Sequence, residues 1–335
     1  MENNILTNEK SYAISVVRCC AMLSIILCHV FNEIPKISFL GQFFNVGIVL
    51  FMIISGYLYG KKNIIDVRKW IVKRFKTICV PIYVYYVLTF LLYSILKINQ
   101  PFEIKKSIIA IFNMQGIVNG GLSNIILSHL WFITYILICY CITPFLQYMR
   151  KKGKKNIYAF IITSIVIVAI LQLKIGVQNV WTIIYYITAY FGSSFRKNIV
   201  SNKKAYFMII FAIIMRLFMK YVLGIYDKFY VLNLLYENII VPILQWILGI
   251  GIFFTIYYMS IRYYDSLKYI NKQVKKIDSM SYYIYIVHYM FLVGELSVIK
   301  LMGNLFLGMG VFIVFTVIYA LIIKKITDYI VDRRK

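Results

Sequence analysis

The sequence predicts an all-α membrane protein, a polytopic helical bundle of about ten transmembrane helices with both termini in the cytosol. Of its 335 residues, 61% are hydrophobic and 15% are charged, and the mean hydropathy is +0.78. Soluble domains contain about 45–50% apolar and about 25% charged residues. The apolar residues also occur in blocks of about 20, the length that crosses the hydrocarbon core of a bilayer as a helix. A soluble globular protein is therefore excluded.

The apolar blocks place ten spans along the chain, at 12–31, 43–60, 78–97, 126–149, 157–173, 180–195, 205–224, 240–260, 281–300 and 304–323. Lysine and arginine test this assignment. With the N-terminus inside, 27 of the 37 lie in predicted cytosolic segments, eight in outer loops and two within spans. Such an excess on one side is what the positive-inside rule predicts for correctly drawn spans.

The net charge of +25 is mostly accounted for by this inner rim, so membrane lipids rather than nucleic acid are the expected partners. Some of these cations could instead attract a cytosolic polyanion. All six cysteines fall in or beside predicted spans, so no disulfide is expected, and Cys139 and Cys141 lack the spacing of a structural zinc site. No metal site is predicted. Without an internal repeat, residues 1–335 form a single predicted membrane domain.

The longest segment between spans, 97–125, predicts an interfacial or re-entrant helix. Isoleucines between 104 and 111 form one apolar face, with Lys105 and Lys106 beside it. The segment ends at the turn Asn119-Gly120-Gly121. It is either a lid over the bundle or a roof over an acceptor site.

Arg18 and His29 interrupt the first span. An arginine at the centre of a bilayer costs about 2.5–3.5 kcal/mol to insert. The two residues are eleven positions apart, so on a helix they share one face at a separation of about 16 Å. Glu33, four residues after His29, returns to that face and could hydrogen-bond the imidazole. Alternatively, Arg18 snorkels to the inner headgroups and His29 is an interfacial polar residue.

Further candidates lie in or beside other spans. Gly47 and Gly56 would let the second span approach a neighbour closely. A basic loop over 61–77 follows it, and Pro81 begins the next span. Trp131 is either a substrate contact or an anchor in the aromatic belt at the membrane interface. The candidate substrate-binding residues are Ser55, Tyr57, His129, Trp131, Arg216 and His288.

Taken together, these segments resemble acyltransferase family 3, the ten-helix membrane acyltransferases that include sugar O-acetyltransferases of bacterial envelopes. The resemblance covers nearly the whole chain. The loop before Pro81 departs from it, with lysines where arginines are commoner, and we do not expect residues 1–335 to include the extracellular hydrolase-like domain that some members carry. The matching features are Arg18-x10-His29, the Leu-Phe-x-x-x-Ser-Gly-Tyr-Leu run at 50–58, the basic loop before Pro81, Leu130-Trp131-Phe132 with Pro144, and Ser281…Tyr285…His288.

The resemblance implies an enzyme of the bacterial plasma membrane. It would move an acyl group, usually acetyl, from cytosolic acyl-CoA to a hydroxyl of an extracytoplasmic or lipid-linked glycan, with no tightly bound cofactor. His29 would be the general base and Glu33 would fix its tautomer. Tyr57, Ser55 or Trp131 would stabilise the oxyanion. The acyl-CoA ligands would be Arg18, Lys73, Arg74 and Lys76.

Two other classes compete with this hypothesis. A flippase or exporter of a lipid-linked glycan or small anion would also carry intramembrane Arg and His, but the chain lacks the inverted repeats and paired broken helices of many transporters. A sensor without either activity is the third class. The residues leave open the acceptor, the choice between acetyl and succinyl, an acyl-histidine intermediate and the oligomeric state.

Overall fold

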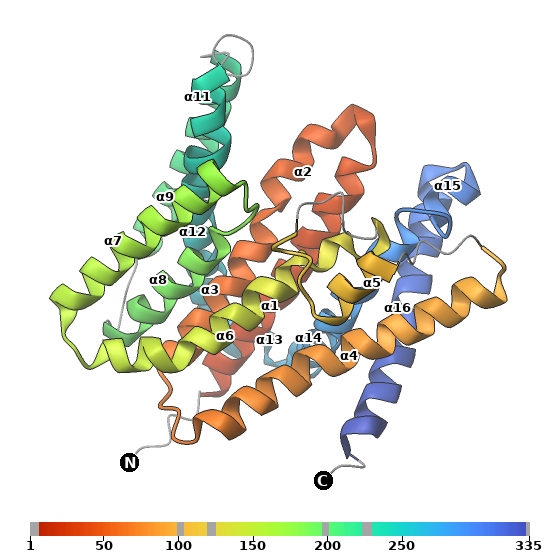
Figure 1. Cartoon of the computed structure of the whole chain (residues 1–335), viewed down its shortest axis with the longest axis horizontal. Helices are drawn as coiled ribbons and strands as arrows, with labels where there is room; N and C mark the ends of the chain where they lie inside the picture. The colour runs from red at the N-terminus through yellow and green to blue at the C-terminus, as the bar shows by residue number, and fades with distance from the viewer. Residues whose placement is uncertain (1–6, 99–103, 119–124, 196–200, 223–229, 333–335) are drawn as a thin grey trace. The chain divides into compact units, whose positions relative to one another are not determined.

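The computed structural model describes residues 7–98, 104–118, 125–195, 201–222 and 230–332. Over these ranges the chain is helical and has no β-strand (Figure 1). It divides into two compact units. Unit 1 comprises Met1–Ser24, Asn45–Ile65 and Cys141–Lys275, and unit 2 comprises Ile25–Phe44, Asp66–Tyr140 and Lys276–Lys335. The α-helices are α1 (Asn8–Asn32), α2 (Ser38–Phe44), α3 (Val46–Gly60), α4 (Val67–Ile95), α5 (Ile104–Ile111), α6 (Trp131–Arg150), α7 (Lys154–Ile170), α8 (Thr182–Phe195), α9 (Asn202–Leu217), α11 (Tyr230–Leu235), α12 (Val241–Arg262), α13 (Tyr264–Leu267), α14 (Asn271–Val287), α15 (Val298–Met302) and α16 (Leu305–Asp332).

In the described part of the chain, seven helical stretches are long and apolar enough to cross a membrane. Each coincides with one of the ten predicted spans. The predicted spans 180–195, 205–224 and 281–300 hold shorter helices. The count of ten and the cytosolic termini stay predictions. The seven stretches are Asn8–Asn32, Pro35–Gly60, Val67–Ile95, Leu127–Arg150, Lys154–Ile175, Val231–Arg262 and Leu305–Val331.

The prediction of one continuous helix over 281–300 is wrong. α14 begins ten residues earlier and ends at Val287, and a 3₁₀ turn, η8 (His288–Phe291), follows it. Gly294 then takes a left-handed conformation with φ +78°, and the chain resumes a helix only at α15. Glycine adopts this conformation without the steric cost that other residues incur, so it provides a natural break in an otherwise apolar run.

The predicted basic loop over 61–77 is also mostly helix. α4 begins at Val67 because Asp66 caps it, accepting a hydrogen bond from the Lys69 backbone N–H at 2.9 Å. The lysines and arginines after that cap therefore project from the first three turns of a helix. The span predicted at 78–97 is the continuation of the same helix.

Unit 1 is built on close contacts of α3 (Figure 1). α3 packs along α8, and α12 packs against both α3 and α9. A Cβ at Gly56 would collide with the carbonyl of Tyr186, and one at Gly60 with the carbonyl of Tyr190. The close helix approach predicted at Gly56 is confirmed, with Gly60 as a second contact point one turn later.

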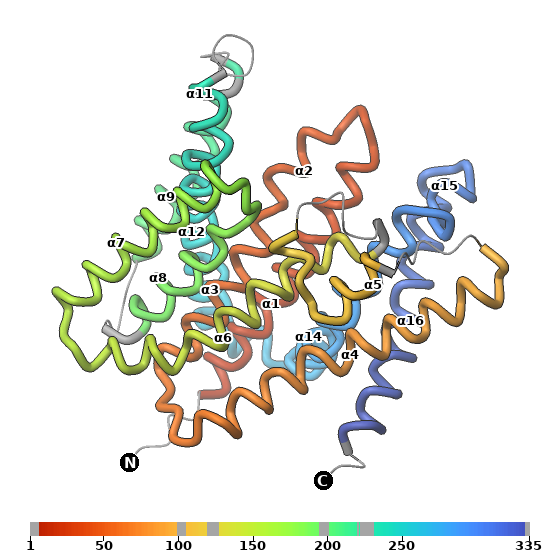
Figure 2. The backbone as a smooth tube through the Cα atoms, viewed as in Figure 1, coloured from red at the N-terminus to blue at the C-terminus, as the bar shows by residue number. Residues whose placement is uncertain are grey.

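In unit 2, α16 crosses α4 and packs on α15 (Figure 2). η8 contacts η3 (Ile125–Leu130) and α16. α5 confirms the helix predicted in 97–125, whereas the Asn119-Gly120-Gly121 turn lies outside the described residues. The segment after α5 is fixed to α6: the Gly116 N–H donates to Thr134 Oγ1 at 2.9 Å, and the Tyr135 hydroxyl donates to the Gly116 carbonyl at 2.7 Å.

Candidate active site

All three histidines of the chain meet in unit 2. The ring centroid of His288 lies 5.3 Å from that of His29 and 5.3 Å from that of His129. Tyr289 closes the group, with its ring 4.8 Å from His29 and 4.9 Å from His129. We refer to His29, His129 and His288 as the histidine cluster. It brings together α1, η3 and η8, which are far apart in the sequence.

The end of α14 orients two of these rings. Because the helix stops at Val287, its last carbonyls need other donors. The Tyr285 carbonyl accepts from His288 Nδ1 at 2.7 Å, and the Ile286 carbonyl accepts from His129 Nε2 at 3.0 Å. A carbonyl can only accept, so these contacts place the ring proton on Nδ1 of His288 and on Nε2 of His129. The Tyr285 hydroxyl in turn donates to the His129 carbonyl at 2.7 Å.

Burial distinguishes His29 from the other two. His129 is 3% exposed and His288 is 0% exposed, whereas His29 is half-buried. A general base must reach the proton that it removes. Of the three imidazoles in the cluster, His29 is the one whose side chain is partly exposed.

Glu33 does not form the hydrogen bond with His29 that the sequence predicted. α1 ends at Asn32, and the Glu33 backbone N–H is shared between the carbonyls of His29 and Val30, both at 3.2 Å. An N–H shared between two carbonyls in this way is common at the end of a helix. The Glu33 side chain is exposed, and its carboxylate makes no hydrogen bond or ion pair within the described ranges.

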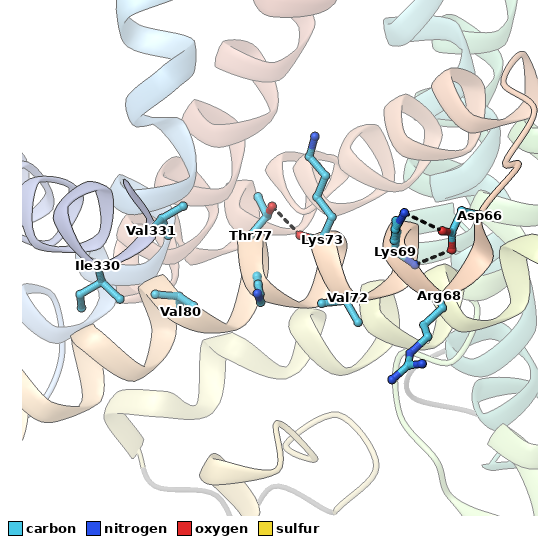
Figure 3. A pocket seen from close by; sticks show the side chains of 10 residues that line it. Asp66, Arg68, Lys69, Val72, Lys73, Thr77, Val80, Ile330 and Val331 are labelled. Carbon is cyan, nitrogen blue, oxygen red and sulfur yellow. Dashed lines mark hydrogen bonds and ion pairs between the residues drawn. The ribbon is translucent and has the colours of Figure 1, made fainter. Parts of the chain in front are cut away.

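A second feature of unit 2 is a groove of about 950 Å³ between the first turns of α4 and the end of α16 (Figure 3). Lys69 is turned back onto Asp66, with Nζ 3.5 Å from the carboxylate, while Lys73 and Arg68 extend away from that pair. We call this feature the basic groove. Its lining residues are Asp66, Arg68, Lys69, Val72, Lys73, Lys76, Thr77, Val80, Ile330 and Val331.

Three residues of this segment were predicted to bind acyl-CoA. Two of them, Lys73 and Lys76, line the basic groove. The third, Arg74, is not among the lining residues, and its guanidinium lies 5.9 Å from the ring centroid of Trp70. The groove therefore holds exposed cations on a helix, with apolar side chains of α16 beside them. A polyphosphate with an apolar or amide-containing extension fits that combination of charge and surface.

Four predicted site residues belong to unit 1. Arg18 is half-buried within α1, the same helix that carries His29. Arg216 is 8% exposed and its Nη1 donates to Gln245 Oε1 at 2.6 Å. The Tyr57 hydroxyl accepts from Lys61 Nζ at 2.8 Å, and Ser55 is half-buried on α3, the helix that packs along α8. The histidine cluster is complete without these four.

Trp131 begins α6, two residues after His129, and its ring packs 6.0 Å from that of Tyr135. It is half-buried. This position is compatible with a substrate contact at the mouth of the cluster and with an aromatic-belt anchor. Its ring contacts are with Phe132 and Tyr135 of α6.

Tyr289 and the backbone of 285–286 were not predicted as parts of the site. Tyr289 could have been predicted from the sequence, because it follows His288 directly and its ring therefore lies on the same turn. The two carbonyls carried no such signal, since only the end of α14 makes them available. Among the described residues, no three His, Cys, Asp or Glu side chains are grouped so that they could hold a metal ion.

The arrangement as a whole is a partly exposed imidazole beside two buried ones that are anchored to backbone carbonyls, with an exposed cationic groove in the same unit. Over residues 11–325 the chain matches a family model described as an acyltransferase domain. The chain belongs to acyltransferase family 3. No curated protein and no solved structure matches it. The family assignment and the seven apolar stretches identify an integral membrane protein of an acyltransferase family.

Proposed function

We propose that this member of acyltransferase family 3 moves an acyl group, acetyl in the first instance, from cytosolic acyl-CoA to a hydroxyl of an extracytoplasmic or lipid-linked glycan. The observation that carries the proposal is the partly exposed His29 imidazole, which lies beside the buried His288 ring at a centroid distance of 5.3 Å. Such a group can remove the proton of a hydroxyl while its surroundings stay dry. The bacterial plasma membrane is the proposed location.

The donor side of the proposal rests on charge. CoA carries several phosphates, and Lys73 and Lys76 present exposed ammonium groups in the basic groove. Arg74 supports them on the same helix, and Arg18 lies on α1, eleven residues before His29. A cationic groove raises the local concentration of an anionic ligand even without a fixed geometry. We assign donor binding to these four residues, with no tightly bound cofactor.

The acceptor side of the proposal rests on the six polar residues that the sequence singled out as substrate contacts. His129, His288 and Trp131 belong to unit 2, and Ser55, Tyr57 and Arg216 to unit 1. A hydroxyl, an indole N–H or a guanidinium near the reacting carbonyl would stabilise the oxyanion that develops during acyl transfer. We propose Ser55, Tyr57, Trp131 and Arg216 as substrate contacts, with Tyr57, Ser55 and Trp131 as the oxyanion donors, whereas the buried His129 and His288 act through His29.

The decisive experiment follows acetyl-CoA in the purified protein. The protein in nanodiscs is incubated with acetyl-CoA, and free CoA is measured by mass spectrometry, because the six cysteines would react with thiol reagents. Consumption that is lost in His29→Ala supports acyl transfer. A flippase or exporter would leave acetyl-CoA intact in both proteins. Mass spectrometry of envelope glycans with and without the gene then identifies the acceptor as a mass difference of one acyl group.

A further inference from the structure

His288 has a ring nitrogen that finds no hydrogen-bond donor in the described part of the chain. Nδ1 donates to the Tyr285 carbonyl, so in the neutral ring the lone pair lies on Nε2. Nε2 is shielded from solvent and makes no hydrogen bond, and the side chain is 0% exposed. A buried acceptor without a donor is unfavourable. A donor from a neighbouring side chain is therefore expected.

The polar groups that face the His288 ring are His29 of α1, His129 of η3, Tyr285 of α14 and Tyr289 of η8. Tyr285 donates its hydroxyl to the His129 carbonyl, and His129 donates its Nε2–H to a backbone carbonyl. The Tyr289 ring lies farther away, with its centroid 6.2 Å from that of His288. The neighbour whose ring N–H is not engaged in such a contact is His29.

The two rings are close to each other, but their nitrogens do not meet in hydrogen-bonding geometry in the structure, so the partly exposed His29 ring has to turn to complete the contact. An N–H···N hydrogen bond of about 2.9 Å between two imidazoles places their centroids about 5 Å apart, and the centroids of His29 and His288 are 5.3 Å apart. We propose that His288 is the positioning residue for His29. Its Nε2 accepts the His29 ring N–H, and this selects the His29 tautomer whose other nitrogen carries the lone pair.

This inference rests on the proposed function, in which the His29 lone pair accepts the proton of the acceptor hydroxyl. The acceptor hydroxyl loses its proton to His29 as its oxygen bonds to the thioester carbon. When the carbon–sulfur bond breaks, His29 returns that proton to the thiolate sulfur. While His29 carries the extra proton, its hydrogen bond to His288 is charge-assisted and about twice as strong as a neutral one. His288 thereby stabilises the imidazolium without changing its own protons, the part that the sequence assigned to Glu33.

Solid-state ¹⁵N NMR of the histidine-labelled full chain in bilayers tests the contact without any substrate. With three histidines in the chain, each ring gives separable signals. We expect a protonated Nδ1 and an unprotonated Nε2 for His288, with a through-hydrogen-bond correlation from Nε2 to His29. In His288→Phe the His29 signals should shift to a mixture of tautomers. Ser297→Ala, which removes another fully buried hydrogen bond of the same segment, should leave them unchanged.

Two substitutions separate hydrogen bonding from packing. His288→Phe keeps a ring but removes the acceptor, whereas His288→Gln keeps an acceptor without the ring. We expect His288→Phe to lower kcat for acetyl-CoA consumption by about 10- to 100-fold with an unchanged KM for acetyl-CoA. His288→Gln should retain more activity than His288→Phe. The opposite order would assign His288 to packing and overturn the proposal.

The two kinds of measurement fail separately. A protonated His288 Nε2, or His29 signals that ignore His288→Phe, would refute the positioning role even if acetyl-CoA is consumed. Intact acetyl-CoA together with the expected NMR correlation would instead refute the proposed acyl transfer and leave the His29–His288 contact standing.

Discussion

The histidine cluster and the basic groove lie in the same unit but are built in opposite ways. In the cluster, His129 and His288 are buried and each donates to a backbone carbonyl. In the groove, the lysines are exposed, and the side chain of Lys69, which pairs with Asp66, is 88% exposed. In a buried site each hydrogen bond is strong, and losing one is costly. Exposed charges attract a ligand through their combined field, which salt screens. The cluster should therefore respond to single substitutions, and the groove only to several.

The largest effect should follow from removing the imidazole at the exposed side of the cluster. His29→Ala should lower acetyl-CoA turnover by about 10²–10⁴-fold, the usual contribution of a general base. The measurement is CoA release by the purified variant in nanodiscs. A monodisperse elution profile equal to that of the wild type shows that the fold is retained. Wild-type turnover in this variant would end the assignment of His29 as the base.

Arg18→Lys should give the next largest effect, because Arg18 shares α1 with His29 but is proposed to bind the donor. Lysine keeps the charge and loses the planar fork that binds a phosphate or carbonyl through two hydrogen bonds. We expect KM for acetyl-CoA to rise by about tenfold, the loss of one charge-assisted hydrogen bond, with a smaller change in kcat. Identical kinetics in Arg18→Lys and wild type would show that the residue only snorkels to the headgroups.

The basic groove should give smaller and graded effects. Lys73→Ala or Lys76→Ala alone should raise KM for acetyl-CoA by about two- to threefold, because exposed charge pairs contribute little individually. The double variant should show a larger rise, and both effects should shrink as salt is added. Lys155→Ala, on an exposed position of α7, is the matched control. Salt-independent losses would assign these lysines to a fixed contact and remove the contrast with the histidine cluster.

Glu33→Gln should have the smallest effect, because the Glu33 carboxylate is exposed and does not reach His29. We expect a change in kcat of about threefold or less, in line with a solvated charge. The comparison variant is His288→Phe under the same conditions. If Glu33→Gln loses more activity than His288→Phe, the carboxylate closes onto His29 during the reaction and the sequence-based assignment of Glu33 is restored.

The sequence predicted the features that depend on local patterns. Apolar blocks located the seven long helical stretches, and the spacing of Arg18 and His29 placed both within α1. The close approach of α3 to α8 followed from Gly56, since a glycine in an apolar helix indicates backbone contact. These inferences use only the period of a helix and the size of a side chain.

Features that depend on helix ends were not predicted. The basic segment after residue 61 was expected as a loop, because the Asp66 cap was not weighed against its charge. Glu33 was paired with His29 on a regular helix, yet α1 ends at Asn32. The meeting of His129 with His288 requires the carbonyls left by α14, and the two residues are 159 positions apart in the sequence. Periodicity carries no information about contacts of that range.

The early end of α14 has a consequence for attempts to make this protein more robust. A stabilising design would replace Gly294 and extend α14 through η8, since glycine is a poor helix former. The lengthened helix would then bond its own carbonyls at 285 and 286 and leave the imidazole protons of His129 and His288 without acceptors. The more regular protein would be the weaker catalyst, and the irregular turn is the part of this fold that engineering should leave untouched.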